Sequence, residues 1–103
     1  KNPRKAVEYL QLAAKQAHVE AQFLLGMAYL IGHGVEKNLQ KAVEYLQLAS
    51  KQGHVDAQYN LGGCYKYGQG VETNPRKAVE YYQISAKQGH VEAQFHLGGC
   101  YKF

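Results

Sequence analysis

Residues 41–76 read KAVEYLQLASKQGHVDAQYNLGGCYKYGQGVETNPR, and this 36-residue unit decides the fold because the chain repeats it on both sides. Residues 5–40 match the unit at 23 of 36 positions, and residues 77–103 match its first 27 residues at 19 positions. A period of about 20–50 residues is typical of stacked supersecondary units, none of which buries its apolar face alone. The repeat therefore predicts an open, elongated stack of units.

Each unit contains two helical stretches and no segment with strand character. The first stretch follows Asn38, a preferred N-cap residue, and the equivalent Asn74 is followed by Pro75, which suits a first helical turn. Apolar residues then recur at i, i+3, i+4 and i+7, the spacing of one helix face. The second stretch has an inward face at Ala57, Leu61, Cys64 and Tyr65. Six helices are predicted, over residues 3–16, 19–31, 38–52, 55–67, 74–88 and 91–102, with Tyr29, Tyr65 and Tyr101 buried between them.

The turn between the two helices of a unit depends on glycine. Gly53 and Gly89 suit the left-handed residue that ends a helix, whereas Ala17 takes this place near the start of the chain. Either Ala17 adopts the left-handed conformation at a cost of about 1–2 kcal/mol, or that turn differs from the others. Gly26, Gly62 and Gly98, inside the second helices, permit another helix to approach closely.

Composition narrows the function classes. The net charge of +4 is modest, and six lysines recur at two positions per unit on faces that look solvated, which favours a role in solubility. Apolar runs are too short to cross a bilayer.

The two cysteines, Cys64 and Cys100, lie one period apart, so equivalent helix packing separates them by about 10 Å. Since a disulfide needs Cα atoms within about 7 Å, we expect two unbridged, largely buried thiols.

The repeated positions also match a known pattern. In the middle of the chain they are Ala57, Leu61, Gly62, Tyr65, Gly68, Gly70, Val71, Lys77, Ala78, Tyr81, Ala86 and Gly89. With these residues at fixed spacing, the chain resembles the Sel1-like repeat family over essentially all 103 residues. It departs from the family where Ala17 replaces a glycine and where Tyr45 and its equivalents replace a frequent tryptophan. Leu12, Leu48 and Ile84 are further departures, apolar where the family commonly has a charged residue.

The resemblance implies an all-α solenoid of antiparallel helix pairs, a right-handed superhelix similar to tetratricopeptide arrays. It also implies a non-catalytic scaffold or adaptor for other proteins. We expect a single array over residues 1–103, with units at 5–40 and 41–76 and an incomplete unit at 77–103. The pattern starts and stops inside a unit, so we interpret the sequence as a fragment of a larger protein. No targeting segment is visible in it, and the sequence assigns no compartment.

By the same resemblance, one face of the second helices lines a concave groove that binds a peptide or a partner helix. The residues predicted to line it are Glu20, Phe23, Met27, Leu30, Asp56, Tyr59, Gly63, Lys66, Glu92, Phe95 and Lys102. The rings of Phe23, Tyr59 and Phe95 form the central hypothesis, because rigid aromatics give a large contact area at low entropic cost. The alternative is that these rings pack between neighbouring units.

Other functions are weighed against this one. Zinc is not expected, because His18, His54 and His90 recur about 10 Å apart and cannot share a metal whose nitrogen ligands lie about 2.0–2.1 Å away. No cofactor or enzyme chemistry is expected, since Ser50-Lys51 lacks the spacing that places hydroxyl and amine on one helix face.

A single-stranded nucleic-acid binder is an alternative function, which is disfavoured because carboxylates lie in the same predicted groove. End-to-end self-association is another, and an apolar row of Leu12, Leu48 and Ile84 is the second candidate surface.

Overall fold

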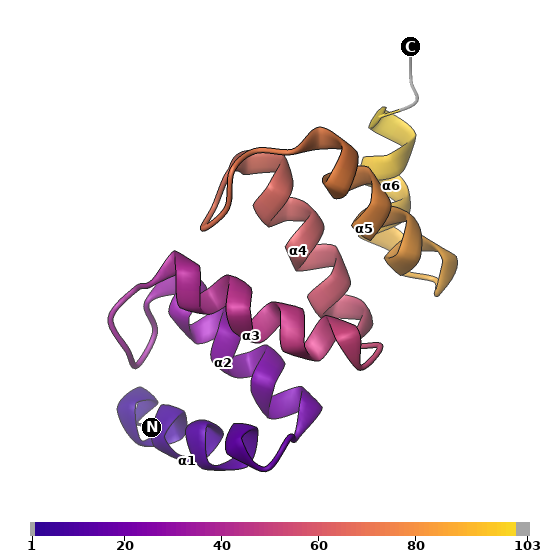
Figure 1. The fold of residues 1–103 in the computed structure, drawn as a ribbon. Coiled ribbons are helices and arrows are strands. Elements are labelled where there is room, and N and C mark those ends of the chain that lie inside the picture. Colours follow the sequence, from indigo (N-terminus) through magenta and orange to yellow (C-terminus); the bar gives the residue numbers. More distant parts are fainter. Residues whose placement is uncertain (1, 101–103) are drawn as a thin grey trace.

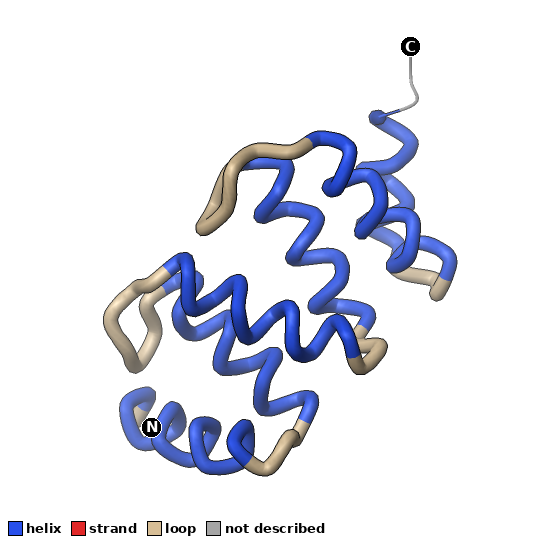
Figure 2. Tube along the Cα trace, viewed as in Figure 1, coloured by secondary structure: helices blue, strands red, loops and turns tan. Residues whose placement is uncertain are grey.

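The computed structural model describes residues 2–100, which form six helices and no strand (Figure 1; Figure 2). They are α1 (Pro3–Lys15), α2 (Val19–Ile31), α3 (Leu39–Lys51), α4 (Val55–Tyr67), α5 (Pro75–Lys87) and α6 (Val91–Cys100). These bounds agree closely with the six predicted helices.

The helices stack in the order of the chain. Each one packs against the helices that precede and follow it, and the molecule measures 46 × 24 × 22 Å. Helices α1 and α6 therefore lie at opposite ends of the stack, and neither folds back on the middle (Figure 1). This is the open array that the repeat predicts.

The first helix of each pair begins at an asparagine cap. The side-chain Oδ1 atoms of Asn2, Asn38 and Asn74 accept hydrogen bonds from the backbone N–H three residues later, at 3.2, 3.0 and 3.1 Å. Each cap satisfies one of the N–H groups that a helix start leaves without a partner. The recurrence of this cap explains why α1, α3 and α5 begin at equivalent positions.

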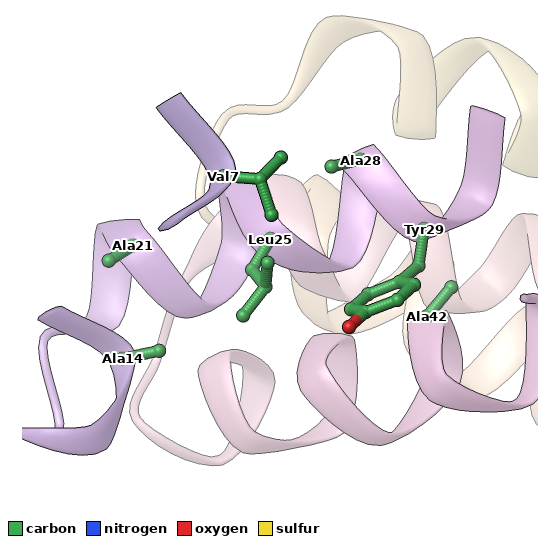
Figure 3. Close-up of a cluster of buried hydrophobic side chains, with 7 residues drawn as sticks. All are labelled: Val7, Ala14, Ala21, Leu25, Ala28, Tyr29 and Ala42. Carbon is green, nitrogen blue, oxygen red and sulfur yellow. The ribbon is translucent and has the colours of Figure 1, made fainter. Parts of the chain in front are cut away.

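Three apolar clusters follow one another along the stack. The first lies between α1, α2 and α3 and includes Leu25 and Tyr29 (Figure 3). The second is built around Leu46 and Leu61, and the third around Tyr65 and Tyr82. The predicted inward face of α4 is buried, as are Tyr29 and Tyr65, whereas Tyr101 lies outside the described residues.

The structure decides between the two alternatives for Ala17 and shows what surrounds the glycines inside the second helices. Ala17 has φ 62°, so it adopts the left-handed conformation in place of the glycine found at the later turns. Gly62 permits close helix packing, because a Cβ built there would lie 2.7 Å from the ring of Tyr82. At Gly26 the corresponding neighbour is Leu46, at 3.1 Å, whereas a Cβ built at Gly98 would meet no atom of the described residues within 4 Å.

The two cysteines differ, which corrects the prediction that both are buried. Neither forms a disulfide; Cys64 is enclosed in the second cluster, and burial raises the pKa of its thiol to about 11. Cys100 is exposed. The reason is that α5 packs over Cys64 on α4, whereas no described helix follows α6 to cover Cys100.

Candidate interaction surface

The second helices begin at histidines. The Nδ1 atoms of His18, His54 and His90 each accept a hydrogen bond from the backbone N–H three residues later, at 3.1 Å. Because Nδ1 accepts, the hydrogen of a neutral ring sits on Nε2, which is free to donate elsewhere. The histidines are thus helix caps, a role that sequence reasoning did not assign to them.

The free nitrogen of each later histidine reaches back to the preceding second helix. His54 Nε2 donates to Glu20 Oε1 at 2.7 Å, and the His54 ring stacks on Phe23 with centroids 4.3 Å apart. One period later, His90 Nε2 lies 3.0 Å from Asp56 Oδ1, and its ring stacks on Tyr59 at 4.4 Å. A carboxylate and a ring three residues apart on one helix therefore hold the histidine that starts the next second helix.

A glutamine pair accompanies each histidine link. Gln52 Nε2 donates to Gln22 Oε1 at 2.7 Å, and Gln88 Nε2 donates to Gln58 Oε1 at 2.8 Å. Gln22 and Gln58 are buried, so these bonds satisfy amides that water does not reach. Sequence reasoning missed both glutamine pairs and the histidine–carboxylate links. The available signal was the recurrence of these residues with the period of the repeat.

We use the name second-helix row for the eleven predicted groove residues. Four of them, Glu20, Phe23, Asp56 and Tyr59, make the links to the following histidine and keep part of their surface exposed. Burial, followed by the charge of Glu92, raises the pKa of the Tyr59 hydroxyl. The predicted rings on α2 and α4 thus combine packing against the next repeat with partial exposure.

The remaining residues of the row differ in exposure. Met27 and Leu30 are half-buried against the second cluster, and Gly63 is half-buried. Lys66 is exposed, 3.4 Å from His96 Nδ1 on α6 and 5.3 Å from the Tyr67 ring. Glu92 and Phe95 are exposed, and Lys102 lies outside the described residues. Contacts such as Lys66 with His96 bring the side chains of α4 and α6 to one side of the stack.

The second candidate surface, which we call the first-helix row, consists of Leu12, Leu48 and Ile84. All three side chains are exposed, on α1, α3 and α5 respectively. They lie one period apart and are apolar, so they form a regular row of exposed hydrophobic side chains. The structure thus offers two exposed rows, one on each set of helices.

The described residues carry no sign of metal chemistry or of a membrane span. Residues 2–100 contain no group of three metal-binding side chains. No helix in this part of the chain is long and apolar enough to cross a bilayer.

Removing the His54 ring should separate capping from the link between repeats. His54→Ala should lower the free energy of unfolding by about 1–3 kcal/mol, because it removes a cap and an aromatic stack. His18→Ala is the matched control: His18 caps α2 in the same way but has no ring or carboxylate partner within residues 2–100, so it should cost about 1 kcal/mol. Urea unfolding measures both, and equal losses would show that the histidine link contributes nothing.

Comparisons with known proteins agree with this architecture. A Sel1 repeat family model matches residues 1–18, 19–54, 55–90 and 91–103. The structure of c5321, a protective antigen of uropathogenic Escherichia coli with an SLR fold, superposes with TM-score 0.94 at 34% identity. That match covers 95% of this chain and 21% of the antigen. A Sel1 repeat protein from Oxalobacter formigenes gives TM-score 0.94 at 35% identity, covering 98% of this chain and 29% of that one.

A further neighbour is similar in size to this chain. Helicobacter pylori cysteine rich protein B gives TM-score 0.86 at 29% identity, covering 94% of this chain and 73% of its own. The chain spans less than a third of the two longer neighbours, and no curated protein matches it. Four successive family matches together cover every residue from 1 to 103. The chain therefore belongs to the Sel1 repeat family.

Proposed function

We propose that the chain is a protein-interaction module that binds an extended peptide or a partner helix along the second-helix row. Sel1 repeats are generally non-catalytic modules for protein–protein interaction. What this chain adds is a row of partly exposed rings, Phe23 and Tyr59, whose positions are fixed by stacking on His54 and His90. A ring held in place before binding loses little entropy when a partner covers it.

The observation that carries the proposal is where the repeats differ. Between α2 and α4 the sequence keeps the buried Leu25/Leu61 and Tyr29/Tyr65 positions. In the same helices Met27, Leu30 and Ile31 become Gly63, Lys66 and Tyr67. Lys66 of the second-helix row is exposed, and so are Ile31 and Tyr67, which flank the row at the ends of α2 and α4. The row and its flanks therefore present a different chemistry on α2 and α4 over the same buried leucine and tyrosine positions, which suits recognition of a non-repetitive partner.

Charge along the row favours a protein over a polyanion. The side chains of Glu20 on α2 and Asp56 on α4 are more than half exposed, and Asp56 lies on the same helix as Lys66. A row that tracks phosphates carries cations without interspersed carboxylates. Mixed charges and exposed aromatics suit a peptide with both polar and apolar side chains.

The proposal is tested by selecting peptides from a random library displayed against the 103-residue chain. Two variants, Lys66→Ala and Tyr67→Ala, should each weaken binding of a selected peptide by about tenfold or more, because each removes exposed contact area. The matched controls are Leu48→Ala and Ile84→Ala on the first-helix row, which should change affinity less than about twofold. All four residues are exposed, so thermal unfolding should stay nearly unchanged. The reverse ranking would move the site to the first-helix row, and failure to select any peptide would contradict the proposal.

A further inference from the structure

The outward face of each first helix carries the same four side chains in every repeat. They are spaced at i, i+3, i+7 and i+10, which places them on one helix face. On α3 they are Lys41, Glu44, Leu48 and Lys51, and all four are exposed. Their equivalents are exposed as well, namely Lys5, Glu8, Leu12 and Lys15 on α1 and Lys77, Glu80, Ile84 and Lys87 on α5. We call each set of four a basic stripe, and the first-helix row passes through all three stripes.

The exposure of this face does not come from an end of the chain. Helix α3 packs against α2 and α4, and α5 packs against α4 and α6, so both have neighbours on either side (Figure 1). Leu48 is nevertheless 44% exposed and Ile84 is 46% exposed. Stacking uses other faces of these helices, where Leu46 and Tyr82 are buried. Further repeats added at either end would therefore leave the stripes open.

Charge is divided unequally between the two sets of helices. Helices α1, α3 and α5 carry eight cationic side chains and three carboxylates, a net charge of +5. Helices α2, α4 and α6 carry one cationic side chain, Lys66, and three carboxylates, a net charge of −2. The positive charge of the chain thus lies on the helices that also expose Leu12, Leu48 and Ile84.

The last lysine of a stripe is open to a partner. Within residues 2–100, neither Lys51 nor Lys87 takes part in a salt bridge or rests on an aromatic ring. The first lysine of the stripes on α3 and α5 has its amine over a tyrosine ring, at 5.5 and 5.3 Å from the centroid. Lys51 follows Leu48 by three residues, and Lys87 follows Ile84 by three. Each of these two apolar side chains therefore has an unpaired amine beside it.

We propose that the chain lies on the surface of an anionic lipid bilayer through its basic stripes. Leu48 and Ile84 enter the boundary between headgroups and acyl chains, and the lysine amines meet acidic headgroups. A lysine suits this position because its long stem lies along apolar surface while its amine stays at headgroup level. Several stripes bind one surface together, so the attraction grows with each repeat.

The composition of the stripes favours a lipid surface over a nucleic acid or an acidic protein. Each stripe is aliphatic at its centre and has no ring on which a base could stack. A nucleic acid would hold fixed phosphates against Glu44, whereas lipids exchange places, so an acidic headgroup can settle at Lys51 and an ammonium-bearing one at Glu44. The three stripes are also alike, which suits a partner that is uniform along its surface, unlike a folded protein.

The inference is independent of the proposed peptide-binding function. It uses the outward faces of α1, α3 and α5, whereas the second-helix row belongs to α2, α4 and α6. A chain held on a bilayer by its first helices keeps Lys66 of the second-helix row available to a protein partner.

Sedimentation of the 103-residue chain with lipid vesicles tests the charge of the stripes. Vesicles of phosphatidylcholine with about 30% phosphatidylserine should bind the chain at least about tenfold more tightly than vesicles of pure phosphatidylcholine. Lys51→Glu should weaken binding to the acidic vesicles by about tenfold or more, because it replaces attraction at the surface by repulsion. Lys66→Glu on α4 is the matched control: it changes the net charge equally, but should weaken binding less than about threefold at physiological salt.

A second pair of variants tests the apolar part of the contact. Leu48→Gln combined with Ile84→Gln keeps the charge and should weaken binding to the acidic vesicles by about tenfold, because both apolar side chains are lost. Tyr67→Gln, which removes an exposed ring from α4, should change it less than about twofold. Circular dichroism checks that each variant folds, and Lys87→Glu replaces Lys51→Glu if the latter does not.

Four results would overturn the proposal. The first is equal binding to vesicles with and without phosphatidylserine, and the second is equal loss for Lys51→Glu and Lys66→Glu, which would reflect net charge alone. The third is unchanged binding of the Leu48→Gln, Ile84→Gln chain. The fourth is a single-stranded oligonucleotide that binds with the same sensitivity to Lys51→Glu while the acidic vesicles do not bind.

Discussion

Gly70→Ala should be among the most destabilising single-methyl changes in this chain. Gly70 has φ 75°, and a Cβ built there would overlap the backbone carbonyl of Leu39 and lie 2.9 Å from Val43 Cγ2. The positive φ costs a non-glycine residue about 1–2 kcal/mol, and overpacking against a fixed backbone costs about 1–3 kcal/mol more. We therefore expect the free energy of unfolding to fall by about 2–5 kcal/mol, measured by urea unfolding.

The control separates backbone strain from crowding. Gly53 has φ 88° but no atom within 4 Å of a built Cβ, so Gly53→Ala should cost only the conformational part, about 1–2 kcal/mol. Ala17 shows that the fold accepts alanine at this type of turn. Equal losses for Gly70→Ala and Gly53→Ala would mean that the loop yields to the added methyl, and that its contact with the start of α3 is unimportant.

Leu61→Ala should also destabilise the fold strongly, by about 2–5 kcal/mol. Leu61 is fully buried in the second cluster, where it packs with residues of both α3 and α4. Truncating it removes apolar contact and leaves a cavity that the surrounding helices fill only in part.

Leu48→Ala provides the comparison for Leu61→Ala with the same chemical change. Leu48 is 44% exposed on α3, so its loss should change the free energy of unfolding by less than about 1 kcal/mol. Chemical denaturation of both variants measures the difference. A Leu61→Ala loss as small as that of Leu48→Ala would show that the inward face of α4 has been misassigned.

The fold was predictable because its signals are local and occur several times. Three signals each act within a few residues: the Asn38 cap, the left-handed turn at Gly53 and the apolar spacing of Leu61 and Tyr65. Equivalent signals recur one period away in the neighbouring repeats. The exposure of Cys100 was not predictable in this way. Equivalent positions in a repeat share a local sequence, but their burial depends on which helices lie beside them, as the contrast with Cys64 shows.

The candidate surface was predictable only in outline. Spacing placed Phe23 and Tyr59 on one face of their helices, and the structure adds that each ring supports a histidine of the next repeat. Helical spacing describes one helix at a time, whereas the links from Glu20 to His54 and from Gln22 to Gln52 join residues 30 or more positions apart. Contacts of this kind depend on how successive repeats are rotated and translated, which no single helix encodes.

The central claim is that partners bind along the second-helix row. Its most direct test is the change in backbone amide NMR shifts of the 103-residue chain when a library-selected peptide is added. We expect the largest changes on α2 and α4, around Met27, Tyr59 and Lys66 of the row and the flanking Tyr67, with Leu12, Leu48 and Ile84 nearly unaffected. Largest changes at Leu12, Leu48 and Ile84, with the second-helix row unchanged, would contradict it.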